Sequence, residues 1–439
     1  MGSTIDNAPW KRRFRAPVIV WTQIAPANPA RGLVINNASG KHQLYAWDVP
    51  SGALRQLTER PAGIRFGLLS GDGRYVYYLD DQQGNEIGHF VRIPFEGGEA
   101  QDLTPGLPPY SALDFAASGS GSHFGFVAAD ADGFHIYSLE TRAPGELGAP
   151  RELFHSPKIA LGPLYSYGGE VAVVATTDRA TVQHYNLLGF DTTSGAPIAE
   201  LWDGPGISLE PVGGFAPQRG DLRLAGITNR SGVKRPFVWN PRSGERVDLD
   251  GSDLEGEIFP VDWSGDARRL LLCQVMQAVQ HLYLYDLTTR TLTQLNHPSG
   301  TLDFLSGPYF GPEGEIFAQW QDAAHPSQLI ALDARTGEKT RIVLTAGDAP
   351  AGHAWTSTTF PSSDGQRIQG WLGLPEGTGP FPTILHAHGG PEGVMTEMYK
   401  PDSQMWLDHG FAFLTISNHP PAEPGAFVYE PLKAANRGR

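Results

Sequence analysis

Short runs of alternating apolar and polar residues fill the chain from about Arg31 to Leu344, and each run is broken by Gly, Pro, Asp or Asn. Alternation with a period of two predicts β-strands that bury one face, and the breaks predict tight turns. Roughly four such strands fall between one recurring turn signal and the next. The pattern therefore predicts an architecture of repeated four-stranded units.

Two turn signals recur through this region. The first resembles Asp-x-x-Ser/Thr-Gly after a strand, with steps of 45, 46, 52, 49, 46 and 47 residues between its anchors Asp48, Ile93, Leu139, Asp191, Asn240, Asp286 and Asp333. The second resembles Ser-Pro-Asp-Gly, with steps of 48, 48, 51, 47 and 47 residues between Gly73, Gly121, Gly169, Gly220, Ala267 and Gly314. Two signals locked to one period of this size predict a β-propeller with seven blades.

Radial closure explains why the units repeat. One small sheet cannot bury its apolar faces alone, whereas a ring buries them between neighbouring sheets. Residues 1–30 precede the repeats as an N-terminal segment, which could contribute strands to the last blade and change the blade count by one. We expect the propeller to cover residues 31–344.

The pattern changes after the last repeat. Residues 345–356 are small, polar and proline-containing, which predicts a linker, and residues 357–439 have a different order of elements. The expected elements are a strand pair joined by a Ser-Asp-Gly turn (Thr358–Leu374), a strand buried on both faces (Thr383–Ala387), a helix end (Gln404–His409) stopped by Gly410, and another buried strand (Phe411–Asn418). The tail beyond Asn418 has neither the two-residue period of a strand nor the 3.6-residue period of a helix, so we expect it to be poorly ordered.

The motif His388-Gly389-Gly390-Pro391 directly follows the strand at 383–387. Two glycines and a proline force a sharp turn and leave backbone N–H groups uncovered by any Cβ. After the third strand of an α/β-hydrolase sheet, such N–H groups stabilise the oxyanion of an acyl-transfer intermediate. A tight turn after any buried strand is the simpler alternative, but the order hairpin, strand, turn, helix and strand favours the hydrolase.

The segment from about Ser357 to Asn418 resembles the start of the catalytic domain in the prolyl oligopeptidase family of serine peptidases, in its acylaminoacyl-peptidase-like branch. The resemblance implies that Gly390 provides an oxyanion-hole N–H, framed by His388 and Gly389. It also implies that the propeller caps the hydrolase and admits short or unstructured peptides. The sequence departs from the family at His419-Pro420-Pro421, where members have a Tyr-Arg-Gly-Ser-like stretch.

The family's nucleophile elbow, Gly-x-Ser-x-Gly, and its Asp and His would follow Arg439. We therefore expect a mainly β protein, a seven-bladed β-propeller followed by an incomplete α/β-hydrolase domain, whose parent activity is hydrolysis of short peptides or acyl-peptides. Alone, the chain is expected to be inactive. Two alternatives stay open: a non-catalytic propeller that binds peptides or proteins, and one half of a split enzyme with a complementing catalytic fragment. A homo-oligomer is also open.

Other motifs are predicted to be structural. Ser166 lies in Ser-Tyr-Gly-Gly, similar to a nucleophile elbow, but Leu164 stands where the elbow needs Gly, and Gly169 belongs to the blade-turn series. The glycines of Ser118–Gly125 lack dinucleotide-binding spacing, and Asp248–Glu257 lacks the glycine and glutamate positions of an EF-hand. His386 and His388 have no third ligand at a telling spacing, so no metal and no cofactor are expected.

Charge and composition restrict the remaining possibilities. The 439 residues carry a net charge of −14, which excludes nucleic acid and anionic membranes as partners but suits a neutral or cationic substrate. Cys273 is the single cysteine and lies in an apolar run, so no intrachain disulfide is possible. The apolar run Ala16–Trp21 is too short for a signal peptide or a membrane span. We expect a soluble cytoplasmic protein.

Overall fold

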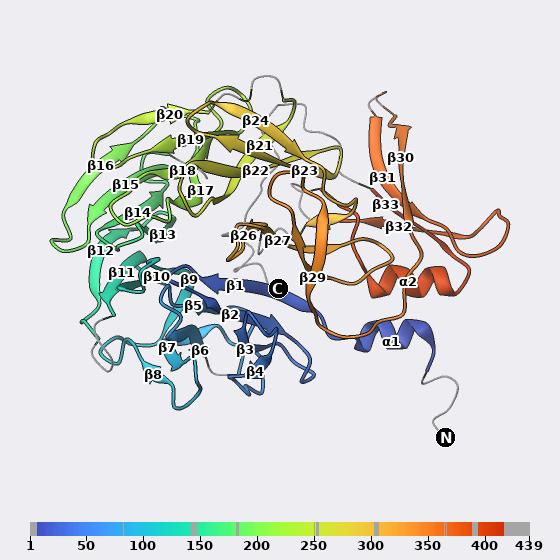
Figure 1. The fold of residues 1–439 in the computed structure, drawn as a ribbon, viewed down its shortest axis with the longest axis horizontal. Helices are drawn as coiled ribbons and strands as arrows, with labels where there is room; N and C mark the ends of the chain where they lie inside the picture. The colour runs from blue at the N-terminus through green and yellow to red at the C-terminus, as the bar shows by residue number, and fades with distance from the viewer. Residues whose placement is uncertain are drawn as a thin grey trace.

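The computed structural model describes residues 7–81, 83–141, 147–180, 184–249, 251, 254–302, 307–363, 365, 367–388 and 394–416. Within these residues, strands β1 to β29 form a ring of seven blades, and β30 to β33 form a separate sheet beside the ring (Figure 1). The predicted fold class, a mainly β chain with a seven-bladed propeller followed by α/β-hydrolase elements, is confirmed.

Each blade is an antiparallel sheet whose strands follow one another along the chain. The first three blades are β1 (Ile19–Ala25), β2 (Asn28–Asn36), β3 (Gln43–Asp48) and β4 (Leu54–Gln56); β5 (Leu68–Leu69), β6 (Tyr75–Asp81), β7 (Ile87–Pro94) and β8 (Gln101–Asp102); and β9 (Tyr110–Ala117), β10 (His123–Asp130), β11 (Gly133–Glu140) and β12 (Arg151–Ser156). Blades two and three are joined into one sheet by pairing of β7 with β9.

The remaining four blades continue the order. They are β13 (Ala160–Tyr165), β14 (Val171–Thr176), β15 (Asn186–Asp191) and β16 (Pro197–Leu201); β17 (Leu209–Phe215), β18 (Leu224–Thr228), β19 (Arg235–Trp239) and β20 (Arg246–Asp248); β21 (Glu257–Trp263), β22 (Arg269–Met276), β23 (Val279–Asp286) and β24 (Thr291–Leu295); and β25 (Thr301–Leu302), β26 (Tyr309–Phe310), β27 (Ile316–Gln321), β28 (Gln328–Leu332) and β29 (Lys339–Thr345). In blade seven, β25 and β26 both pair with β27.

The ring begins earlier than the predicted start at Arg31. Strand β1 starts at Ile19 and pairs with β2 as the innermost strand of the first blade, so it does not extend the last blade. Its burial is irregular, with single buried residues separated by pairs of partly exposed ones, because β1 faces the centre of the ring. The two-residue alternation that identifies the other strands is therefore weak here.

Apolar clusters fill the spaces between neighbouring blades, as radial closure requires. The cluster that joins the last blade to the first contains the fully buried residues Val34, Trp47, Phe317 and Leu329. The ring centres of Trp47 and Phe317 are 6.2 Å apart, and the Gln319 side chain donates a hydrogen bond of 2.7 Å to the backbone oxygen of Ile19. Side-chain packing and this bond close the ring.

Both predicted turn signals have a physical basis. In the first-to-second-strand turn, Ser70, Ser118, Ser166 and Ser264 each accept a backbone N–H five residues ahead, at 2.9–3.1 Å. Glycines such as Gly73 and Gly169 follow with positive φ, where a side chain would be strained. In the third-to-fourth-strand turn, the carboxylates of Asp48, Asp191, Asp286 and Asp333 accept the N–H three residues ahead.

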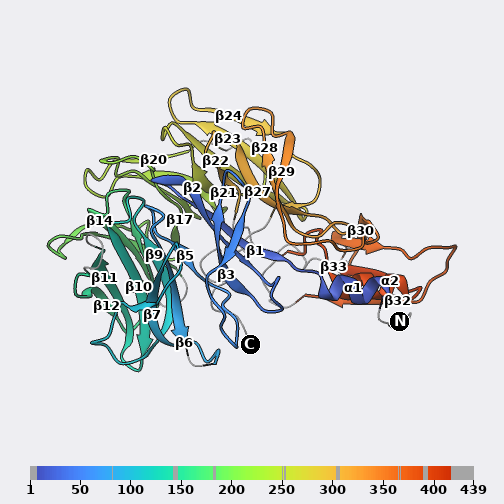
Figure 2. The same cartoon turned by 60° about the horizontal axis from the view of Figure 1, so that its bottom comes forward.

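Because adjacent strands are antiparallel, these two turns lie at the same end of the ring, here called the far end. The second-to-third-strand turns lie at the opposite end, here called the hydrolase end. Two of those turns, at Ala278 and Ala323, pack in one apolar cluster with Trp355 and Trp371 of the separate sheet. The hydrolase elements therefore rest on blades six and seven (Figure 2).

The separate sheet contains β30 (Trp355–Pro361), β31 (Arg367–Gly373), β32 (Thr383–Ala387) and β33 (Ala412–Ile416) in the order β30-β31-β33-β32. Strands β32 and β33 are parallel and the other pairs are antiparallel. Helix α2 (Pro401–Asp408) lies between β32 and β33 in the chain. It ends just before Gly410, whose φ of 83° fits the predicted stop.

Helix α1 (Pro9–Arg15) precedes the ring and lies against α2 (Figure 1). The N-terminal segment therefore belongs to the hydrolase side of the molecule, although it comes before the propeller in the chain. In the part of the chain that the structure describes, no helix is long and apolar enough to cross a lipid bilayer.

Candidate active site

Strand β32 leads into the predicted oxyanion turn, and its exposure corrects one expectation. The strand was expected to be buried on both faces, but Thr383, Leu385 and Ala387 are exposed, with Leu385 63% accessible. The reason is topological: β32 pairs with β33 on one side and is the edge of the sheet among the described strands. Short apolar runs do not distinguish an edge strand from a central one.

The histidines of the motif are positioned by this strand. His386 Nδ1 lies 3.0 Å from the Thr415 hydroxyl of β33, and its ring lies 5.7 Å from that of Phe413. Burial, reinforced by the positive charge of Lys400, lowers the pKa of His386, so it is neutral at pH 7. These contacts fit the prediction of a packed histidine.

The predicted oxyanion turn directly follows β32 in the chain. Its first residue, His388, is half-buried and directly follows the carboxyl end of β32. The predicted oxyanion residues Gly389 and Gly390, together with Pro391, lie outside the described residues. The structure resumes at Val394, so the turn is bounded on both sides by described residues.

The chain beyond the turn is bound to the propeller. Thr301 of blade seven donates its hydroxyl to the backbone oxygen of Glu397, and the Ala323 N–H donates to the Glu397 carboxylate at 3.3 Å. The Tyr399 N–H donates to the Gln321 side chain at 3.1 Å. These bonds fix the downstream end of the turn against the hydrolase end of the ring.

Gln404 connects helix α2, the linker and the propeller. Its side chain is fully buried, accepts the His353 N–H at 2.6 Å, and donates to the backbone oxygens of Ala323 at 2.9 Å and His353 at 3.0 Å. Both side-chain N–H groups and the amide oxygen of Gln404 are therefore hydrogen-bonded within the protein. Sequence reasoning missed Gln404 because a polar residue in a short helix is usually exposed.

Arg13 fixes α1 to the same region. Its side chain is 5% exposed, pairs with the Asp408 carboxylate of α2 at 2.5 Å, and donates to the backbone oxygens of Pro350 at 3.3 Å and Ala351 at 2.7 Å. The sequence analysis placed Arg13 only in an N-terminal segment of residues 1–30. The arginine's burial depends on contacts with residues more than 330 positions away, which leave no local signal.

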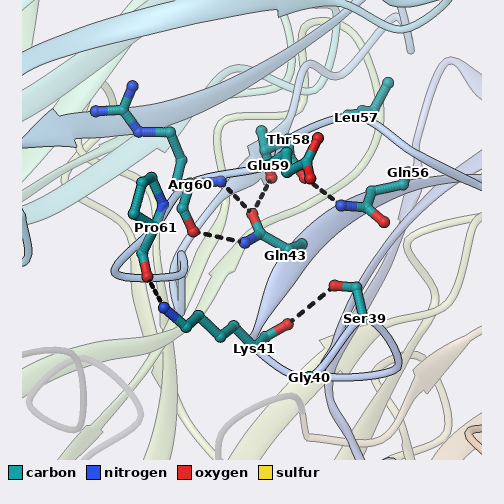
Figure 3. Close-up of a pocket in the computed structure, with 10 residues that line it drawn as sticks. All are labelled: Ser39, Gly40, Lys41, Gln43, Gln56, Leu57, Thr58, Glu59, Arg60 and Pro61. Atoms are coloured by element: carbon teal, nitrogen blue, oxygen red, sulfur yellow. Dashed lines mark hydrogen bonds between the residues drawn. The ribbon is translucent and has the colours of Figure 1, made fainter.

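Two hollows in the described part of the propeller are large enough to be candidate sites. The larger has a volume of about 970 Å³ and lies at the far end of the central channel, with Trp21, Tyr167, Trp263, Tyr309, Asp262 and Arg219 among its lining residues. The other, of about 730 Å³, lies between loops of blade one (Figure 3).

The blade-one hollow is stabilised by its own polar contacts. The Gln43 side chain accepts hydrogen bonds from the Thr58 hydroxyl at 2.9 Å and the Arg60 N–H at 3.1 Å, and donates to the Arg60 oxygen at 2.9 Å (Figure 3). Lys41 donates to the backbone oxygen of Pro61. These bonds hold two loops together, so we assign this hollow a structural role.

The described residues of the remaining sequence motifs make structural contacts. Ser166 is fully buried in the β13–β14 turn, where its hydroxyl accepts the Val171 N–H at 3.1 Å. Cys273 is 2% exposed, and burial raises the pKa of its thiol to about 12. Strand β10 begins at His123, directly after the turn that contains Gly119 and Gly121, so this segment leads into a strand as predicted. Asp248 pairs with Arg230 and Arg246, while residues 250, 252 and 253 lie outside the described part of the chain.

Comparison with known proteins supports the assignment of both parts. Residues 348–421 match the family of FrsA-like esterases. No curated protein matches the sequence. The chain is similar to acylaminoacyl peptidase from Pyrococcus horikoshii, with a TM-score of 0.67 and 12% identity over 92% of this chain and 66% of that one.

Two further solved structures agree. A puromycin-hydrolysing peptidase of Mycobacterium tuberculosis has a TM-score of 0.69 and 16% identity, over 93% of this chain and 66% of that one. An acylaminoacyl peptidase in complex with Z-Gly-Gly-Phe-chloromethyl ketone has a TM-score of 0.67 and 13% identity, over 96% of this chain and 68% of that one. The chain has the fold of the prolyl oligopeptidase family.

The resemblance seen at residues 357–418 is thus confirmed at the level of the fold, and it extends over the whole propeller. The chain spans about two thirds of the length of these prolyl oligopeptidase-type structures. In this fold, the loop after the third hydrolase strand is the one that follows β32, where His388 begins the predicted turn.

Proposed function

We propose that this chain supplies the propeller and the oxyanion turn of a serine hydrolase that acts on short peptides or acyl-peptides. The observation that carries the proposal is the sheet order β30-β31-β33-β32, with the His-Gly-Gly-Pro motif at the carboxyl end of β32. An α/β-hydrolase sheet places an oxyanion donor at this position. The complex of a similar structure with a peptide chloromethyl ketone supports a peptide substrate.

The residues of this chain would stabilise charge and restrict access. In the proposed reaction, a nucleophile attacks the scissile carbonyl, and the Gly390 N–H donates a hydrogen bond to the oxygen as it becomes negative. The bonds of Glu397 and Tyr399 to blade seven would hold the donor in place. The 439 residues contain no Gly-x-Ser-x-Gly elbow, so the nucleophile, acid and base would come from a further polypeptide segment.

An exposed strand edge, together with single exposed apolar side chains on several blades, favours a complementing segment. Along β32, Leu385 is 63% exposed at a sheet edge that the described strands leave open. At the hydrolase end of the ring, Phe66, Ile87, Ile159 and Trp202 are 36–46% exposed. A parallel strand with a covering helix would bury Leu385 and form hydrogen bonds with the backbone groups along the edge of β32.

The test uses the chain isolated under native conditions with whatever polypeptides accompany it. A fluorophosphonate probe should label a serine on a partner polypeptide, and hydrolysis of a chromogenic acyl-peptide amide should follow the labelled partner through fractionation. Peptidase activity that separates from this chain would contradict the proposal. If native material is neither labelled nor hydrolytic but binds peptides saturably in calorimetry, the chain is a peptide-binding propeller.

A further inference from the structure

The hollow at the far end of the channel has the composition of a ligand site. Its volume of about 970 Å³ falls at the upper end of the range of small-ligand sites. Aromatic residues from four blades line it, namely Trp21, Tyr167, Trp263, Tyr309 and Phe310. It is formed by turns at the far end, such as Gly265–Asp266 and Gly311–Gly314, so it lies opposite the hydrolase elements.

Asp262 brings a carboxyl group into this aromatic hollow. In the pairing of β21 with β22, Pro260 faces Leu272 and Asp262 faces Leu271, so Val261 is an extra residue that forms a β-bulge. A bulge redirects the side chain that follows it. Asp262 reaches the seam between blades six and seven, where its Oδ2 accepts the Phe310 N–H at 2.7 Å.

The hollow leaves this carboxyl group without a cationic partner. Asp262 is partly exposed to the hollow, and its partial removal from water raises its pKa to about 7 despite the backbone N–H groups of Phe310 and Trp263. The charged and titratable groups around it are Arg269 of β22, Arg219 of the β17–β18 turn, Asp266 and Tyr309. Among the described residues, none of these guanidinium groups bonds to Asp262.

Asp266, in the same hollow, has the opposite environment. Its carboxylate accepts the Ser264 hydroxyl at 2.6 Å and the Arg268 N–H at 3.1 Å, and these bonds hold its pKa below the ordinary value. Asp266 is therefore already stabilised as an anion. Asp262 is the carboxyl group that would gain most from an added positive charge.

We propose that this hollow binds one organic cation, the side chain of lysine or arginine in an extended peptide, with Asp262 as its counter-ion. Aromatic faces favour cations over neutral groups of the same shape, and a desolvated carboxylate strengthens the preference. The net charge of −14 attracts cationic peptides to the surface. The site is independent of the proposed catalytic turn, because the two lie at opposite ends of the ring.

Matched peptides and variants test this site. Calorimetry on the full chain compares acetyl-Gly-Lys-Gly-amide and acetyl-Gly-Arg-Gly-amide with acetyl-Gly-norleucine-Gly-amide, which keeps the apolar stem without the charge. The cationic peptides should bind saturably and at least tenfold more tightly. Asp262→Asn should remove that preference, since the amide oxygen can still accept the Phe310 N–H but the charge is lost.

Two control variants separate the site from general charge and stability effects. Asp266→Asn removes one negative charge from the same hollow and should leave the preference for cations within about twofold. Asp114→Asn removes a buried carboxyl group elsewhere in the ring, which accepts the Gly162 N–H across another blade seam and is not among the lining residues. It should also leave binding unchanged. Thermal unfolding of each variant confirms that the ring is intact.

Binding should also depend on pH, because a cation favours the ionised form of Asp262. With a pKa of about 7 in the free protein, the affinity should rise about tenfold between pH 6 and pH 8. Titrations in buffers of different ionisation enthalpy should show release of close to one proton per peptide at pH 6. Equal binding of the norleucine peptide, unchanged binding by folded Asp262→Asn, or no saturation at millimolar peptide would overturn the proposal.

Discussion

At the scale of single residues, buried carboxyl groups determine how blades meet. Asp114 is 8% exposed and accepts the Gly162 N–H of the next blade at 2.8 Å and the Phe115 N–H at 2.9 Å. Burial outweighs these bonds and raises its pKa from 3.8 to about 7. Like Asp262, it directly follows a bulged residue, here Leu113.

Asp114 predicts a pH dependence of stability with a definite sign. Because its folded pKa lies above its unfolded value, the folded chain binds more protons between about pH 4 and pH 7. The protonated Asp114 side chain is compatible with its buried site, so the contribution of Asp114 to the free energy of unfolding is fully present below pH 4. It is lost as the pH rises through 7, where the carboxyl group ionises in the folded chain. The difference in free energy of unfolding between wild type and Asp114→Asn should therefore change by up to about 4 kcal/mol between pH 4 and pH 8, in favour of the variant.

Denaturant unfolding at several pH values measures this difference. Asp48→Asn is a suitable comparison, since Asp48 is exposed and its pKa is lowered by the Ser51 hydroxyl and N–H, so its contribution has the opposite sign. A difference between wild type and Asp114→Asn that stays constant with pH would contradict the assigned burial effect.

The residue scale also shows what the sequence could and could not predict. Cys273 and Ser166 were predictable as structural residues because each lies in a local pattern, an apolar run or a periodic turn. Arg13, Gln404 and Asp114 are buried polar residues whose partners are distant in the chain. Local periodicity contains no information about such partners, so these positions required the structure.

At the scale of elements, the turns at the far end pack closely around glycines. A Cβ on Gly71 would lie 2.2 Å from the Gly119 oxygen and 2.3 Å from the Ser118 oxygen. Since both contacts are backbone atoms, relief requires movement of a whole turn. The glycine series therefore serves close packing between blades as well as turn geometry.

This packing predicts a large effect of a small substitution. Gly71→Ala should lower the free energy of unfolding by about 2–3 kcal/mol, because the added methyl group separates blades two and three. Gly106→Ala is the matched control, since a Cβ there meets nothing within 4 Å, and it should change stability by less than about 0.5 kcal/mol. A Gly71→Ala protein as stable as Gly106→Ala would contradict the contact.

The contact between α1 and α2 predicts that the N-terminal helix stabilises the hydrolase elements. Arg13→Ala leaves the Asp408 carboxylate without its buried partner, and breaking such a pair costs about 3–5 kcal/mol. Limited proteolysis should therefore cut residues 345–416 at least tenfold faster than in wild type. Arg12→Ala, on the exposed side of the same helix, should leave the rate unchanged.

The decisive comparison in that experiment is between the cleavage rate of the propeller blades and the cleavage rate of residues 345–416. If Arg13→Ala accelerates cleavage in the blades as much as in residues 345–416, the helix stabilises the whole chain, and the proposed local role is wrong.

For strands, the hydrophobic pattern predicts where an element lies in the chain but not its place in a sheet. The strand at Thr383–Ala387 was predictable, but its position at the edge of the sheet was not, because edge and central strands differ in pairing and not in local sequence. Strand β1 was not placed in the first blade, since its burial follows the centre of the ring and not a period of two.

At the scale of the whole molecule, the repeat period predicted the ring, its seven blades and the change of architecture after Leu344. It could do so because each blade repeats the same two turn chemistries. Ring closure by Trp47 and Phe317, and the position of the hydrolase elements on blades six and seven, depend on contacts between distant segments. The oxyanion turn remains a prediction, since Gly389 and Gly390 lie outside the described residues.

We propose that this chain supplies the propeller and the oxyanion turn and that a further polypeptide segment supplies the nucleophile. The most direct test is the rate at which the purified 439-residue chain hydrolyses a chromogenic acyl-peptide amide. The account predicts a rate equal to the uncatalysed background, because the proposed oxyanion donor would act without a Gly-x-Ser-x-Gly nucleophile elbow in these 439 residues. Saturable turnover that accompanies the chain through purification would contradict it. Loss of that turnover in Ser166→Ala would show that the blade-turn serine had been misassigned.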